Sequence, residues 1–175
     1  QSGDAHKARD LFADLLPDQA RVLGPHHPDV LLTRSNLAWW TGQCGEAREA
    51  RDLFAELLPD QAQVLGPDHP DVLTTRNNLA WWTGQCGDAH KARDLFAALL
   101  PDQAQVLGLV HPDVLRARGN LAYWTGQSGD AHKARDLFAT LLPDQERVLG
   151  PVHPDVLRTR NNLAWWTAKA DEASI

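Results

Sequence analysis

Apolar residues recur at helical spacing in the second quarter of the chain. Between positions 46 and 65, one face of a helical wheel collects Ala47, Ala50, Phe54, Leu57, Leu58, Val64 and Leu65, with Gln61 as its polar member. This pattern predicts an amphipathic helix that ends at Gly66, where glycine supplies a left-handed stop. Pro59 lies inside the stripe, and because the stripe continues past it, we predict one kinked helix and not two short ones.

A second kind of helix begins at the phrase His-Pro-Asp. His69 is placed to cap it, Pro70 suits the first helical position, and Asp71 complements the positive end of the helix dipole. Gly84 and Gly87 then bracket a tight turn into the next amphipathic helix. Because the connections are short, successive helices are expected to be antiparallel neighbours.

Both kinds of helix occur four times. Gln1, Gln43, Gln85 and Gln127 lie 42 residues apart, and aligning them brings the whole sequence into register without an insertion. Such a period is typical of a solenoid, in which each helix pair packs only on its neighbours. We therefore predict an all-α solenoid of eight helices in one array. Its bounds are 1–175, with units at 1–42, 43–84, 85–126 and 127–168 and a C-terminal tail at 169–175.

The two end helices, near 4–23 and 154–170, each lack one neighbour of the opposite kind. We expect both to expose apolar surface and to associate head-to-tail with other copies of the chain. The repeat begins in mid-phrase at Gln1, so we also expect a fragment of a longer array.

The composition of the chain argues against nucleic acid and membranes as partners. The net charge is −6 with acids and bases interspersed, so no basic stripe for nucleic acid is present. No stretch approaches the roughly 20 apolar residues that cross a bilayer. We expect a cytoplasmic protein without nucleic-acid or membrane partners. Cys44 and Cys86 occupy equivalent positions about 10 Å apart in stacked helix pairs, beyond the ~7 Å Cα limit for a disulfide, which predicts free thiols.

The sequence contains no recognisable set of catalytic residues. The sequence shows no nucleophile-base-acid combination and no phosphate-binding glycine loop. His26 and His27, and the row of His6, His90 and His132, lack the spacing of zinc ligands. We expect no enzyme, no metal and no cofactor.

One polar and aromatic face suggests a binding groove. A helical wheel places Asn36, Trp39 and Gln43 opposite Leu31 and Ala38. An asparagine amide both donates and accepts, so it can pair with the backbone of an extended peptide, and exposed rings supply contact area. The predicted groove residues are Asn36, Trp39, Gln43, Asn78, Trp81, Gln85, Asn120, Tyr123, Gln127, Asn162 and Trp165. Arg116 and Arg158, which replace Leu32 and Thr74, join this set and hint at an acidic ligand end.

The same residues have a purely structural interpretation. Each ring of the Trp39 row can lie sideways against the neighbouring helix, while the amides bond across repeats. Both interpretations stay open at this stage. A second row, Trp40, Trp82, Trp124 and Trp166, is predicted to be core.

The residues Leu37-Ala38, followed by Gly45, Ala50 and Phe54, match the small-large pattern of tetratricopeptide repeats. The connector at 64–72 is similar to that of the 42-residue repeats of kinesin light chains. The resemblance implies a right-handed superhelix, a protein-binding scaffold, and a concave surface at positions 32, 35, 36, 39 and 43. It departs at Thr41, where the family usually has Tyr, and at Arg34, where a large apolar residue is expected.

Two alternatives to a binding groove remain. One is a structural spacer that self-assembles through its ends. The other is the sensor arm of a larger NTPase signalling protein, which the resemblance to bacterial multidomain proteins implies. The His-Pro-Asp phrase also resembles the tripeptide of co-chaperone J-domains, but that motif occurs once in a loop, whereas here it begins every second helix. Capping is therefore the favoured interpretation.

Overall fold

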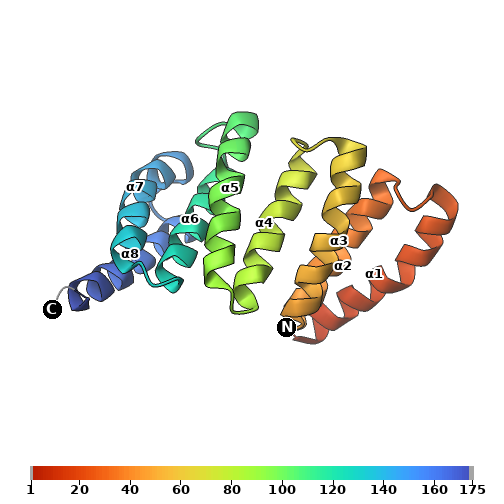
Figure 1. Ribbon diagram of the computed structural model, residues 1–175, viewed down its shortest axis with the longest axis horizontal. Helices are drawn as coiled ribbons and strands as arrows, with labels where there is room; N and C mark the ends of the chain where they lie inside the picture. The colour runs from red at the N-terminus through yellow and green to blue at the C-terminus, as the bar shows by residue number, and fades with distance from the viewer. Residues whose placement is uncertain (1, 174–175) are drawn as a thin grey trace. The chain divides into compact units, whose positions relative to one another are not determined.

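Eight α-helices and no strand make up residues 2–173, the part of the chain that the computed structural model describes. They are α1 (Ser2–Leu23), α2 (Pro28–Gln43), α3 (Ala47–Leu65), α4 (Pro70–Gln85), α5 (Ala89–Leu107), α6 (Pro112–Gln127), α7 (Ala131–Leu149) and α8 (Pro154–Glu172) (Figure 1). The odd-numbered helices are the amphipathic kind and the even-numbered ones begin at His-Pro-Asp. The predicted all-α solenoid and its element order are confirmed.

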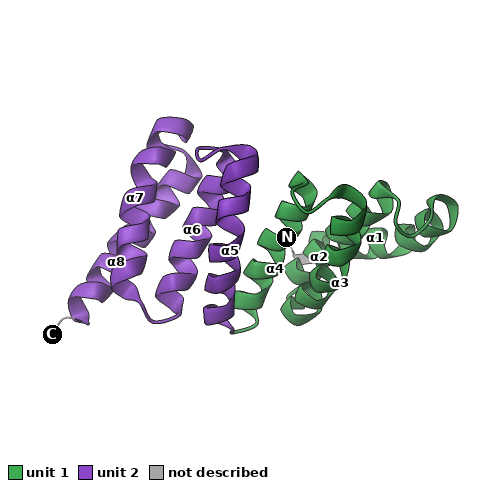
Figure 2. Ribbon diagram, turned by 45° about the horizontal axis from the view of Figure 1, so that its top comes forward, with its two compact units in different colours: residues 1–87 green, residues 88–175 purple. Residues whose placement is uncertain are grey.

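The chain forms two compact units, residues 1–87 with α1–α4 and residues 88–175 with α5–α8 (Figure 2). Within each unit every helix packs on the helix before it and the helix after it. The even helices of a unit also touch each other, α2 on α4 and α6 on α8. Each unit is therefore a pair of helix pairs with its own core.

The even helices begin as predicted. In all four, the N-cap is a histidine in extended conformation whose side chain accepts a hydrogen bond from the aspartate two residues on. In α4, the Asp71 amide donates to His69 Nδ1 at 3.2 Å. The repeated tripeptide is thus a helix start, which removes the J-domain interpretation.

The glycines after the odd helices have a different conformation from the one expected. Gly66 has φ 91° and ψ 150°, not the left-handed helical values near +57° and +47°. Its N–H donates to the Ala62 carbonyl at 3.1 Å, and its own carbonyl accepts from His69 at 3.2 Å. The chain leaves the helix in an extended direction that only glycine adopts readily, because it must reach the next N-cap in three residues.

The prolines do not divide the odd helices. Pro59 lies inside α3, and the helix runs without interruption from Ala47 to Leu65. Pro17, Pro101 and Pro143 lie inside α1, α5 and α7 in the same way. The continuous helix is confirmed, and the bend at each proline stays a prediction.

The core of each unit uses the same six repeat positions. In the first unit it consists of Leu31, Ala38, Ala50, Phe54, Leu57 and Trp82. In the second unit it consists of Leu115, Ala122, Ala134, Phe138, Leu141 and Trp166. These side chains come from two even helices and the odd helix between them. Burying a large apolar side chain contributes roughly 1.5–3 kcal/mol, so the four large residues Leu31, Phe54, Leu57 and Trp82 dominate the first core.

A tryptophan of one even helix packs on a glycine of the previous one. A Cβ added at Gly42 would overlap the indole of Trp82, and one added at Gly126 would overlap that of Trp166, both well inside the 3.0 Å closest approach of real Cβ atoms. Trp82, Trp124 and Trp166 are 5–7% exposed, as predicted for core residues. Trp40 is only half-buried, contrary to the prediction, because α2 has no earlier even helix within the chain to receive its ring.

The arginines at the unexpected position 34 of the repeat form ion pairs between helices. Arg34 on α2 lies 2.6 Å from Asp60 on α3, and Arg118 on α6 lies 2.7 Å from Asp144 on α7. Arg118 lowers the pKa of Asp144, mainly through their hydrogen bond. The arginine thus replaces an apolar contact by a link to the following odd helix. Arg160 on α8 turns back to Glu146 on α7 at 2.6 Å.

In the first unit, a repeated side-chain hydrogen bond joins the two helices of each pair. Gln61 Oε1 accepts from Thr75 Oγ1 at 2.6 Å inside the core, and Gln19 and Thr33 form the same bond. The third repeat has Ala117 in place of the threonine, and among the described residues Oε1 of Gln103 is buried without a hydrogen bond. Oε1 of Gln145 is also without one, although Thr159 is present.

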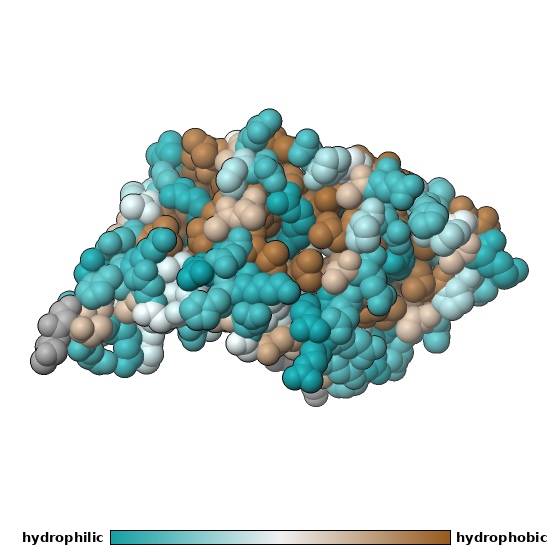
Figure 3. All heavy atoms as spheres, in the orientation of Figure 1, coloured by the Kyte–Doolittle hydropathy of each residue, from teal (hydrophilic) through white to brown (hydrophobic). Residues whose placement is uncertain are grey.

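On the face drawn in Figure 3, hydrophobic residues show between hydrophilic ones. None of the helices described has the length and hydropathy needed to cross a membrane. Cys44 and Cys86 are free thiols, as predicted.

Candidate functional site

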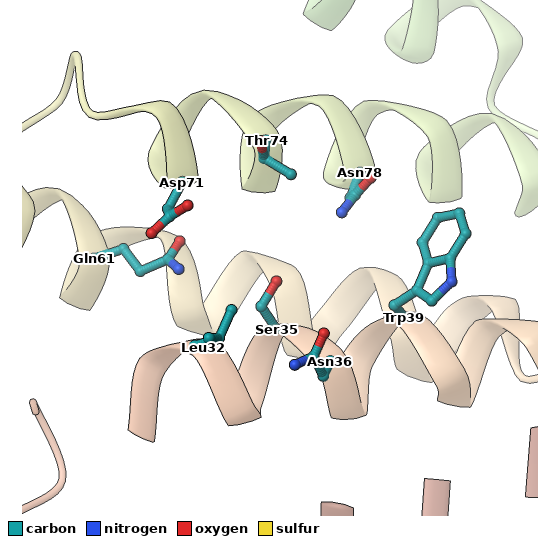
Figure 4. A pocket seen from close by; sticks show the side chains of 8 residues that line it. All are labelled: Leu32, Ser35, Asn36, Trp39, Gln61, Asp71, Thr74 and Asn78. Atoms are coloured by element: carbon teal, nitrogen blue, oxygen red, sulfur yellow. The ribbon is translucent and has the colours of Figure 1, made fainter. Parts of the chain in front are cut away.

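A hollow of about 180 Å³ lies between α2 and α4 in the first unit. Eight residues line it, and Figure 4 shows how their side chains surround the space: Leu32, Ser35, Asn36 and Trp39 from α2, Gln61 from α3, and Asp71, Thr74 and Asn78 from α4. Gln61 and Asp71 lie at one end and Trp39 lies at the other (Figure 4). The hollow is lined by about two helical turns of α2, from Leu32 to Trp39.

The repeat explains why these residues meet. Positions 32, 35, 36 and 39 follow the i, i+3, i+4, i+7 spacing of a single helix face. Thr74 and Asn78 are the residues one repeat after Leu32 and Asn36. Because α2 and α4 pack on each other, the same face of both helices borders one hollow.

The polar groups of the hollow suit an extended backbone. Asn36 and Asn78 are half-buried, and each amide can both donate and accept. The Gln61 side chain is fixed by its bond to Thr75, so its amide faces the hollow in a set orientation. The neighbouring Asn77 donates to Asn78 Oδ1 at 3.5 Å, and its own Oδ1 is buried without a hydrogen bond among the described residues.

The Trp39 ring is both packed against a neighbouring helix and partly exposed, so it fits the structural and the binding interpretation of the sequence. Its ring packs edge-on against Trp82, with centroids 5.8 Å apart and planes at 64°. It is nevertheless 37% exposed and lines the hollow. An edge-to-face contact of this kind holds the ring in place, which leaves one of its surfaces available at little entropic cost.

The charge of the hollow is negative. Asp71 is the single ionisable residue among the eight lining residues, and its side chain is 57% exposed. The Nδ1 atom of His69 lies 3.7 Å from Asp71 Oδ2. The same nitrogen accepts a hydrogen bond from the backbone N–H of Asp71.

Three glutamines of the predicted groove lie outside the hollow. Gln43, Gln85 and Gln127 are exposed at the last positions of α2, α4 and α6. Gln85 instead borders a shallower hollow of about 470 Å³ at the turns, with Cys86 and residues 45–49. In the first unit, Gln43 and Gln85 therefore do not line the hollow that Asn36, Trp39 and Asn78 line.

Three of the predicted groove residues of the second unit, Arg116, Arg158 and Trp165, have partners within their own helices. Arg116 pairs with Asp113 at 2.8 Å, and Arg158 pairs with Asp155 at 2.6 Å. The Trp165 ring, 58% exposed, lies 5.4 Å from Lys169 Nζ, a cation–π contact.

The remaining predicted aromatic and amide positions are half-buried. The Tyr123 ring packs edge-on against Trp124 at 5.0 Å. Trp81, Asn120 and Asn162 are likewise half-buried. Each of these four side chains is therefore packed on one side and exposed on another.

Two lining residues were missed by the sequence analysis as site residues. Gln61 is the polar member of an otherwise apolar helix face, which is an indication that could have identified it. Asp71 was assigned only to the helix start, and its proximity to Thr74, one turn on, was the available clue. Among the described residues, no group of three or more His, Cys, Asp or Glu is arranged to hold a metal ion.

The sequence matches family models of one kind of helical repeat. Family models of the tetratricopeptide repeat match residues 42–101 and 114–155. No curated protein matches the sequence.

Solved structures extend the likeness to nearly the whole chain. Two crystal structures of a Podosopora anserina protein, described as a kinesin light chain with nearly identical TPR-like repeats, have TM-scores of 0.81 and 0.79. Both are 26% identical and align over 99% of this chain and 84% of theirs. BtubC (BKLC) from P. vanneervenii has a TM-score of 0.81 at 22% identity, over 97% of this chain and 67% of its own, and supports the fold alone.

Proposed function

Because the chain belongs to the tetratricopeptide repeat family, of the kinesin-light-chain type, we propose that it is an interaction scaffold that binds an extended peptide between α2 and α4. Repeats of this family generally mediate protein–protein interaction. The proposal adds a location and a kind of ligand. The peptide lies along the hollow, its backbone pairs with the amides of Asn36 and Asn78, and one apolar side chain rests on Trp39.

The observation that carries this proposal is the coincidence of two patterns. Six of the eight lining residues occupy only four repeat positions, those of residues 32, 35, 36 and 39. These are the positions that lie on one helix face and that differ in character from the buried face of the same helix, which carries Leu31 and Ala38 at 0% exposure. A groove made of repeated positions fits a ligand that is itself repetitive, and an extended backbone is such a ligand.

The experiment is a selection of random peptides on the chain, followed by affinity measurements on the recovered sequences. Asn36→Ala removes one amide from the hollow and is expected to weaken binding about tenfold, since a lost hydrogen bond of this kind is worth roughly 1–1.5 kcal/mol. Gln63→Ala removes an exposed amide of α3 outside the hollow and serves as the control. Equal affinities of the two variants, or the recovery of no peptide, would overturn the proposal.

Self-association through the ends is the second candidate, and exposed apolar residues favour it. Leu15 on α1 is 44% exposed, whereas Leu57, one repeat later, is 0% exposed. Leu157 on α8 is 45% exposed, whereas Leu115, one repeat earlier, is 0% exposed. An α8 from one copy would cover the α1 of another if the repeat continued between copies.

One residue opposes that continuation. Position 168, which is glycine in the first three repeats, is Ala168 in α8, and in a continued repeat Trp40 of a second copy would pack on it. The contact of Trp82 with Gly42 leaves no room for such a methyl group. We therefore rank self-association second. Light scattering over a wide concentration range decides the matter, because a constant monomer mass would exclude it.

A further inference from the structure

The aspartate that follows the capping histidine has different surroundings in the two units. Asp29, Asp71, Asp113 and Asp155 follow the capping histidine at the start of each even helix. In the second unit, an arginine one turn later pairs with this aspartate, Arg116 with Asp113 and Arg158 with Asp155. The paired side chains of Asp113 and Asp155 are 37% and 34% exposed.

The first unit leaves the same carboxylate uncovered. The residue one turn after Asp71 is Thr74, and the residue one turn after Asp29 is Leu32. Asp71 and Asp29 are accordingly 57% and 68% exposed. Only Asp71 borders the hollow, because the hollow begins at the N-terminal turn of α4 and not at that of α2.

We propose that the groove of the first unit selects extended peptides that carry a lysine or arginine, with the cation at Asp71 and an apolar side chain towards Trp39. The inference rests on the proposed function and adds the chemistry of the partner. Charge complementarity is its basis: the one ionisable group of the hollow is negative, and none of the other seven lining residues carries a charge. The net charge of −6 acts in the same direction at longer range.

The alternative of an acidic ligand loses its support in the structure. Arg116 and Arg158 suggested such a ligand from the sequence, but each guanidinium is held by the aspartate of its own helix. An acidic side chain of a peptide in the hollow of the first unit would approach the Asp71 carboxylate, and the two negative charges would repel each other. A metal ion in place of a peptide cation is disfavoured, because a single carboxylate is a poor ligand set.

The test compares two matched variants. Asp71→Asn and Asp29→Asn each replace the second residue of an even helix by its isosteric amide, so their effects on helix stability are equal to first order. A library of random peptides is selected on the wild-type chain, and the recovered peptides are measured by fluorescence polarisation. We expect the peptides to be enriched in lysine and arginine and to bind Asp71→Asn about fivefold more weakly, with less than a twofold change for Asp29→Asn.

Salt and a third variant complete the test. The difference between the two variants is expected to disappear near 1 M salt, where charges are screened within about 3 Å. Thr74→Arg copies the arrangement of Arg116 and Asp113, and a selection on this variant is expected to lose the basic enrichment. Enrichment of acidic or uncharged peptides on the wild-type chain, or equal effects of the two asparagine variants, would overturn the inference and leave the peptide-binding proposal standing. A selection that recovers no peptide dependent on Asn36 would overturn both.

Discussion

Replacing Gly42 by alanine is expected to destabilise the first unit, although alanine is the better helix former. In an exposed helix the exchange gains about 1 kcal/mol. At this position the new Cβ would overlap three indole atoms of Trp82, a ring that is 6% exposed and enclosed by the core of the unit. Overpacking costs about 1–3 kcal/mol. Because the new Cβ would overlap three ring atoms, we take the upper end of this range, which leaves a net loss of about 2 kcal/mol after the helix-propensity gain.

The chain contains its own controls for this effect. Gly126→Ala meets the Trp166 ring in the same way and is expected to lose a similar amount in the second unit. Gly119 also lies inside an even helix, but a Cβ there would sit 3.5 Å from Leu141 Cδ2, an ordinary contact. Gly119→Ala is therefore expected to stabilise by about 0.5–1 kcal/mol. The same exchange thus has opposite signs at two helical positions.

The assay is urea unfolding followed by circular dichroism, combined with amide hydrogen exchange read separately for α2–α4 and α6–α8. Because repeat arrays can unfold in parts, the exchange data show which unit is affected. Faster exchange confined to α2–α4 is expected for Gly42→Ala. The reasoning is refuted if Gly42→Ala is as stable as the wild type, or if Gly119→Ala is destabilised to the same degree.

Three further predictions concern buried bonds, caps and ion pairs. Ala117→Thr offers Gln103 Oε1 a donor and is expected to raise the urea midpoint by the equivalent of about 1 kcal/mol. Asp130→Ala removes an N-cap bond and should cost about 1 kcal/mol, whereas Glu46→Ala, whose carboxylate caps nothing, should cost less in the same unfolding assay. The lowered pKa of Asp144 contributes stability above about pH 4 that is lost as the pH falls through the lowered value, so the difference in melting temperature between wild type and Arg118→Gln should shrink from pH 7 to pH 3.

Local sequence patterns predicted the elements of the fold well, because the determinants are close in the chain. The cap at His69 and the stop at Gly66 each depend on atoms within four residues, so their positions could be derived from the sequence. The conformation of Gly66 could not be derived in the same way, since a positive φ is compatible with two values of ψ. The choice depends on where the next helix must begin.

Contacts between helices were less predictable. Arg34 was identified from the sequence as a departure from the family pattern, and its partner Asp60 could not be named, because the pair depends on how far α3 is shifted along α2. The hollow was predicted on its α2 and α4 sides from one helix face. The end of the hollow formed by Gln61 and Asp71 depends on helix register and on the depth to which α3 lies between its neighbours, which no single-helix pattern contains.

The packing of tryptophan on glycine gives the array a direction of growth. A duplicated helix pair inserted before α1 would offer its glycine to Trp40, whose ring is only half-covered now. A pair appended after α8 would have to bring its own tryptophan onto Ala168, and Asp171 stands where Gly45, with φ 94°, makes the turn into the following odd helix. We therefore expect that a helix pair duplicated before α1 needs no change at this contact, whereas a pair added after α8 needs at least two substitutions, at Ala168 and Asp171, to repeat the packing of tryptophan on glycine and the glycine turn.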